Sequence, residues 1–213
     1  MFPNSSLARV AAIAVFAAAA PTLEAQAARS NTRGVMFGAH LNGSALTYEK
    51  QDAESGGGAG IALGWGFTPK LQVFLNVDAA KVDIKVEPGN GQDPDIDVGE
   101  SYALVHGDIG LRYSFANPNR AFVPYVSAAF STRAATAEVL GEDVSISGPA
   151  FTVGGGIQYF FTEKLALDAG LLFSTGKFDT VKVGNVTIDG IDSETSNTTR
   201  FNIGVKFYPQ IRK

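Results

Sequence analysis

The chain has 213 residues, a formal net charge of −4 and no cysteine. The lack of cysteine excludes disulfides, thiol catalysis and cysteine-ligated metals, and it suits a chain that crosses an oxidising periplasm. No segment reaches the ~18 uninterrupted apolar residues of a transmembrane helix, so any membrane crossing must be made by strands that close into a barrel.

The first 27 residues are predicted to be a cleaved secretory signal peptide. Arg9 supplies the positive charge, and an apolar stretch follows over residues 10–20, too short to cross a bilayer as a helix. Pro21 ends this stretch, and Ala25-Gln26-Ala27 has the small-x-small pattern of a cleavage site. The predicted organisation is a signal peptide over residues 1–27 and one domain over residues 28–213. A short buried helix opening a globular domain is the alternative.

Eight segments of alternating apolar and polar residues follow, and each predicts a β-strand. They cover about residues 33–47, 59–67, 71–86, 101–115, 121–131, 151–161, 165–174 and 199–208. The phase of the fifth is ambiguous, because Tyr125 and Phe130 claim opposite faces. Short turns at residues 68–70, 117–119 and 162–164 alternate with long loops at residues 49–58, 87–100, 132–149 and 176–198. Valines and an isoleucine in the last loop suggest that its flanking strands extend into it as a hairpin.

This even number of strands, with short turns and long loops in alternation, predicts an all-β fold. An eight-stranded antiparallel up-and-down transmembrane β-barrel requires that alternation and places both termini on the short-turn side. One face of each segment is large and apolar, and the other is rich in Gly, Asp, Arg and Gln. Because a lumen of eight strands is too narrow for the larger face, we expect the apolar face to point outward into lipid.

Aromatic residues gather near the short-turn ends of the predicted strands. Such rings form a girdle where a barrel meets the membrane–water interface; ordinary core aromatics are the alternative. The predicted girdle consists of Trp65, Phe67, Tyr113, Phe115, Tyr159, Phe161, Phe207 and Tyr208.

With these features the chain resembles the small outer-membrane β-barrel family of the OmpA/OmpX type over about Arg33–Tyr208. The resemblance rests on the signal peptide, the similar turn-plus-strand runs at residues 67–71 and 161–165, the stretch at 122–126 and the alternating last strand. It implies an outer-membrane location, contact with outer-membrane lipid and lipopolysaccharide, and assembly by the barrel-assembly machinery. Members usually end on an aromatic residue that this machinery reads, whereas here Phe207-Tyr208 is followed by residues 209–213.

Inward polar residues predict a network that plugs the lumen. An unpaired charge in a confined, poorly hydrated interior costs several kcal/mol. We therefore expect Asp108 and Asp168 to pair with Arg112 and Lys206, and a wide diffusion pore is not expected. The predicted lumen network consists of Asp108, Arg112, Asp168, Lys206, His106 and Gln72.

Catalysis is not predicted. His106 has Asp108 two residues further on the same face, and Ser174 is inward on another strand, toward its outer end. A His–Asp pair without a well-placed serine favours a lumen histidine over a catalytic one. No catalytic residue and no cofactor is therefore assigned.

The four predicted long loops are acidic, with fifteen Asp or Glu residues against four Lys or Arg residues. Asp93, Asp95 and Asp97 resemble the start of a calcium loop, but the glycine falls at Gly99, one place late, and Leu104 stands where the last acid belongs. A solvated acidic loop is the prediction, and loose divalent-cation binding is the alternative. Basic residues form no patch interleaved with aromatics, so a nucleic-acid partner is not expected.

The leading functional hypothesis is a non-enzymatic outer-membrane barrel of a Gram-negative-type envelope. It would be structural and would display acidic loops for adhesion or ligand contact. The alternatives are a narrow channel for small solutes, and a soluble periplasmic lipocalin-like barrel that binds a ligand inside.

Overall fold

The computed structural model describes residues 30–48, 53–83, 101–117, 119–139, 142–184, 186–190 and 195–209. The predicted signal peptide lies outside these residues, as do Asp93, Asp95 and Asp97 of the second predicted loop. No helix in the described part of the chain has the length and hydropathy of a membrane span.

Strands form the whole of the regular structure in the described residues. They are β1 (Gly34–Tyr48), β2 (Glu54–Gly66), β3 (Leu71–Asp83), β4 (Ser101–Ser114), β5 (Phe122–Val139), β6 (Glu142–Phe160), β7 (Leu165–Lys177), β8 (Thr180–Val183), β9 (Val186–Asp189) and β10 (Thr195–Phe207).

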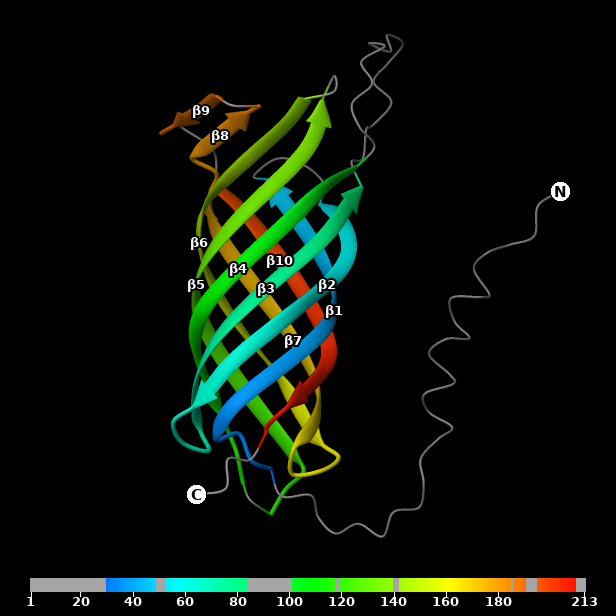
Figure 1. The fold of residues 1–213 in the computed structure, drawn as a ribbon, viewed down its shortest axis with the longest axis vertical. Helices are drawn as coiled ribbons and strands as arrows, with labels where there is room; N and C mark the ends of the chain where they lie inside the picture. The colour runs from blue at the N-terminus through cyan, green and yellow to red at the C-terminus, as the bar shows by residue number, and fades with distance from the viewer. Residues whose placement is uncertain are drawn as a thin grey trace, which may run out of the picture.

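Eight of these strands close into an antiparallel barrel, as predicted. Each pairs with its neighbours along the chain, and β1 pairs with β10 to complete the circuit. Figure 1 shows a tall, tilted barrel in which β8 and β9 lie beyond one end. We call that end the loop end, and the opposite end, with the short turns, the turn end. The start of β1 and the end of β10 both lie at the turn end (Figure 1).

Side chains alternate between an apolar exterior and a polar interior. On β3, for example, Leu75 is 46% exposed on the outside, whereas the inward Asn76 and Asp78 are 6% and 1% exposed. This confirms the outward apolar face that the sequence predicts. A lipocalin-like barrel requires the reverse arrangement, since water would surround it.

The repeated sequence at two short turns makes the same hydrogen bonds. Thr68 Oγ1 accepts from the Leu71 amide at 2.9 Å, and Thr162 Oγ1 accepts from the Leu165 amide at 3.0 Å. A backbone bond from the residue before each threonine closes each turn, at 3.0 Å in both cases. The threonine hydroxyl thus holds the amide of the next strand in place.

The aromatic girdle at the turn end is present, with one correction. Its outward rings are 42–55% exposed, and Tyr113–Phe115 and Tyr159–Phe161 are edge-to-face pairs, each with centroids 5.2 Å apart. Tyr208, however, is 1% exposed and points inward, where its ring packs against Phe160.

The prediction of a third loop over residues 132–149 is wrong. β5 and β6 continue through most of it as one long hairpin, with register pairs from Thr132↔Pro149 to Val139↔Glu142. The alternation is weak here because Ala134, Ala135, Thr136 and Ala137 differ little in polarity between the two faces. In the fifth strand, Tyr125 is inward and Phe130 outward, at 5% and 75% exposure.

The first predicted loop is shorter than expected, because β2 already begins at Glu54. The last predicted loop contains a hairpin, as its valines suggested, but it is separate from the flanking strands. β8 and β9 pair with each other, and β8 also pairs with β6. We call β8, β9, residues 132–139 of β5 and residues 142–149 of β6 the hairpin extension.

The barrel interior is layered. An apolar layer closes each end, and polar side chains fill the middle. The turn-end layer consists of Met36, Ala62, Val123, Phe160, Ala166 and Tyr208. The loop-end layer consists of Leu46, Val82, Tyr102, Leu104, Ala135 and Phe178.

Candidate functional site: the lumen and the loop-end cavity

Arg200, on β10, is the centre of the first polar cluster. Its guanidinium is fully buried and donates to Asp108 through both terminal nitrogens, at 2.9 and 3.0 Å. It also donates to Asp78 at 2.6 Å and to Ser174 at 3.2 Å. His40 contacts the other oxygen of Asp78. These five side chains form the Arg200 cluster, which joins β1, β3, β4, β7 and β10 across the lumen.

Small polar side chains satisfy the remaining oxygens of the Arg200 cluster. Ser131 donates to Asp108 at 2.6 Å, and Thr152 bridges the Ser131 and Ser174 hydroxyls. The His40–Asp78 contact crosses β2 directly above Gly60, where an added Cβ would lie 2.1 Å from the carboxylate. The glycine-rich inward face of β2 therefore leaves room for large side chains from its neighbours.

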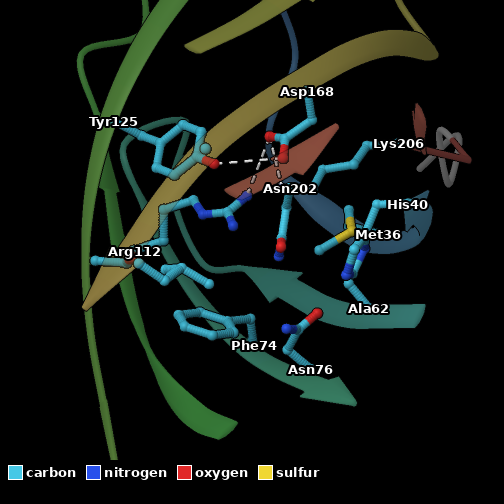
Figure 2. Close-up of a pocket in the computed structure, with 13 residues that line it drawn as sticks. Met36, His40, Ala62, Phe74, Asn76, Arg112, Tyr125, Asp168, Asn202 and Lys206 are labelled. Carbon is cyan, nitrogen blue, oxygen red and sulfur yellow. Dashed lines mark hydrogen bonds and ion pairs between the residues drawn. The ribbon is translucent and has the colours of Figure 1, made fainter. Parts of the chain in front are cut away.

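Asp168, on β7, is the centre of the second polar cluster, most of which Figure 2 shows. It accepts from Lys206 at 2.7 Å, from Gln158 at 3.0 Å and from the Tyr125 hydroxyl at 3.3 Å. Arg112 lies further away, with its Nη1 3.8 Å from the carboxylate. We call these five residues the Asp168 cluster.

Aromatic rings hold Arg112 in this cluster. Its guanidinium carbon lies 4.0 Å from the centroid of Tyr125 and 5.4 Å from that of Phe74 (Figure 2). Stacking of this kind stabilises a cation that lacks a close carboxylate.

The space between the two clusters is small. A cavity of about 30 Å³ is lined by side chains of both, including His40, Arg112 and Lys206, together with Asn202. A cavity of that size holds no more than one or two waters.

The predicted network is divided between these clusters. Asp168, Lys206 and Arg112 come together, and Gln72 lies opposite Arg112 in the β3–β4 register. Asp108 instead pairs with Arg200. Four residues along one strand span ~13 Å, so Asp108 and Arg112 lie at different depths of the lumen.

His106 does not assemble with Asp108 and Ser174 into a catalytic arrangement. It is 1% exposed, and its Nε2 has no hydrogen-bond partner in the described part of the chain. Asp108 and Ser174 are both hydrogen-bonded to Arg200.

Sequence reasoning missed two lumen arginines. Arg200 shares the inward phase of Lys206, six residues further along the same strand, so strand periodicity alone could have found it. Arg133 fell in the wrongly predicted third loop. It is fully buried, donates to Ser196 and Thr198, and lies with its guanidinium carbon 4.8 Å from the Phe178 ring centroid.

A second cavity, of about 180 Å³, lies at the loop end. We call it the loop-end cavity. The Tyr102 hydroxyl donates to Glu54 at 2.8 Å on one side of it. Its lining residues are Glu54, Tyr102, Ala135, Ala137, Val144 and Ile146.

Several solved structures share this fold. Neisserial surface protein A is 18% identical, with a TM-score of 0.60 over 82% of this chain and 96% of that one. OprG from Pseudomonas aeruginosa is 14% identical, with a TM-score of 0.53 over 84% and 98%. Ail, the attachment invasion locus protein of Yersinia pestis, is 13% identical, with a TM-score of 0.52 over 83% and 100%.

Identities this low establish the fold alone. No curated protein matches the sequence. The family model described as the outer membrane protein beta-barrel domain matches residues 10–208, most of the chain. The chain therefore belongs to the outer membrane protein beta-barrel domain family, and it is a protein of the cell outer membrane.

Proposed function

We propose that this protein is a non-enzymatic and non-conducting outer-membrane barrel whose loop end makes contacts with ligands. The observation that carries the proposal is the filled lumen. The Arg200 cluster ties five strands together across the interior, and the cavity beside it measures only about 30 Å³. A hydrated solute has no path through these side chains unless several buried ion pairs separate.

Two of the three side chains that a Ser–His–Asp arrangement would need have structural partners, which supports a non-enzymatic role. Asp108 and Ser174 are engaged by Arg200, and His106 is buried beside them. Apolar layers close the lumen above and below, so a substrate has no route to these groups. A general base must come within hydrogen-bond reach of its substrate, and this histidine does not meet that condition.

The girdle and the turns favour one orientation. Barrels of this class have short turns on the periplasmic side and long loops outside. The turn end would then face the periplasm, with both termini, and the hairpin extension would face the exterior. The acidic loops predicted from the sequence would surround it, available for adhesion or ligand contact. Contact with lipopolysaccharide and assembly by the barrel-assembly machinery are part of the same proposal.

A narrow channel is the competing function, and conductance in planar lipid bilayers distinguishes the two. We expect the folded protein, identified by a heat-dependent shift in gel mobility, to give no stepwise current. The triple variant Asp78→Ala/Asp108→Ala/Arg200→Ala, which removes the ion pairs that tie the strands together without leaving a lone carboxylate or guanidinium, is the matched positive control. Discrete openings of the unmodified protein, as frequent as those of the variant, would overturn the closed-lumen proposal.

A further inference from the structure

We propose that the loop-end cavity binds small amphiphilic cations: an aromatic or branched aliphatic group enters the cavity and an ammonium group pairs with Glu54. This inference rests on the proposed role of the loop end in ligand contact. It adds a site and a ligand class to that role.

The polarity of the outward face reverses along β5 and β6. Phe130 and Phe151 are outward, and their rings form an edge-to-face pair with centroids 5.9 Å apart. Beyond them the outward residues become polar, as in the Thr136–Ser145 pair, whose hydroxyls are 3.1 Å apart. The hairpin therefore leaves lipid at these phenylalanines and has water on its outward face.

The inward face of the same segment becomes apolar beyond Arg133, at Ala135 and Ala137 of β5. Strand register places these residues side by side on one face, because directly paired residues and residues two apart share a face. Val186 and Ile188 are still 62% and 53% exposed at the outer edge of this face. The face consists of Ala135, Ala137, Val144, Ile146, Val181, Val183, Val186 and Ile188. A continuous apolar surface in water, rather than in lipid, is typical of a contact site.

The loop-end cavity has the size of a small organic group. The loop-end cavity measures about 180 Å³ and lies at the base of this apolar face. An apolar cavity of about 150 Å³ accommodates benzene. The cavity is thus large enough for one phenyl ring or a branched alkyl group, and too small for a folded peptide segment.

The charge of the cavity lining and of the predicted loops favours a cation. Among the described residues, Glu54 is the one acidic side chain that lines the cavity, and one of its carboxylate oxygens accepts from Tyr102 at 2.8 Å. The other oxygen can still accept a hydrogen bond from a ligand. The predicted long loops hold fifteen acidic residues against four basic ones, which attracts cations and repels anions. A ligand with an apolar group and an ammonium therefore suits both the apolar lining of the cavity and the negative potential of the predicted loops.

The test is calorimetric titration of the protein in lipid nanodiscs, with empty nanodiscs as the baseline for partition into lipid. Three probes share one ring and differ in charge: phenethylammonium, 2-phenylethanol and phenylacetate. We expect saturable binding of phenethylammonium, about tenfold tighter than that of the neutral probe, because a charged hydrogen bond is added. Equal affinity for the cation and the neutral probe, or tighter binding of phenylacetate, would overturn the proposed ligand class.

Three variants test the site. Glu54→Gln should remove the preference for the cation, whereas Asp143→Asn, an exposed acid of β6 away from the cavity lining, should preserve it. Ala137→Phe should fill the cavity and abolish binding of all three probes. Binding that persists in folded Ala137→Phe, or a preference that survives Glu54→Gln, would place the ligand elsewhere. Bilayer conductance tests the closed lumen separately, so failure of one proposal is distinguishable from failure of the other.

Discussion

The membrane-spanning barrel and the hairpin extension are built from the same strands with opposite polarity. Within the barrel, β5 turns Val126 outward and Ser131 inward; in the extension it turns Thr136 outward and Ala135 inward. The strand is continuous and its side-chain period does not change. This change of polarity matches the proposed surroundings, which are lipid around the first region and water around the second.

The two regions also differ in how fully their inward faces are filled. In the barrel, ion pairs and hydrogen bonds occupy the interior, and the cavity between the clusters measures about 30 Å³. In the extension, apolar side chains leave a cavity of about 180 Å³. Polar groups thus form the structural core of the barrel, whereas the extension has an apolar surface that is partly exposed.

Removal of Arg200 should have the largest effect on stability. Arg200→Met leaves Asp78 and Asp108 buried together without their shared cation, and loss of one partner of a buried pair costs about 3–5 kcal/mol. The free energy of unfolding in lipid vesicles can be measured by urea titration. Trp65, the single tryptophan of the chain, reports it by fluorescence from the outer face.

A triple variant separates the charge effect from the loss of packing. Asp78→Asn and Asp108→Asn, added to Arg200→Met, remove the unpaired carboxylates and should restore part of the lost stability. If the single and triple variants have the same free energy of unfolding, buried charge is not the reason for the loss.

A lysine on the outward face of β5 should have the next largest effect on stability. We expect this loss only in the part of the strand that lies in the membrane. Val126 is 50% exposed on the outer face, and an outward lysine in lipid costs up to about 2–4 kcal/mol, the value at the bilayer midplane. Thr136→Lys makes the same change to charge ten residues further along the strand, where water surrounds it, and should alter stability by less than about 0.5 kcal/mol. Equal losses in the two variants would mean that the hairpin extension also lies in lipid.

The sequence predicted the barrel because its evidence is periodic and repeated. The same lipid boundary is indicated by the eight alternating segments, by short turns such as residues 68–70 and by the outward aromatics. The Asp168–Lys206 contact also follows from depth along the strands. These features depend on local spacing, which a single sequence contains.

The interior partners and the hairpin extension were harder to predict, for physical reasons. Which carboxylate Arg200 meets depends on strand stagger around the whole barrel, since Asp78 and Asp108 come from strands that do not neighbour β10. Past the membrane boundary, the alternation continues with small residues such as Ala135 and Thr136, whose polarity contrast is weak. Their pairing with residues 142–149 places them in a strand, which their own sequence pattern does not indicate.

Substitutions that add methyl groups should have the smallest effect on stability. They test whether the barrel interior is more tightly filled than the hairpin extension. An added Cβ at Gly170, inside the barrel, would lie 2.5 Å from the Tyr125 hydroxyl that binds Asp168. Gly170→Ala should therefore cost about 1–3 kcal/mol, as overpacking does. Ala137→Val adds two methyl groups at the loop-end cavity, where space is available and a β-branched residue suits the strand, so its cost should stay below about 0.5 kcal/mol. The same urea titration measures both. A larger loss for Ala137→Val than for Gly170→Ala would mean that the loop end, rather than the polar interior, is the tightly packed region.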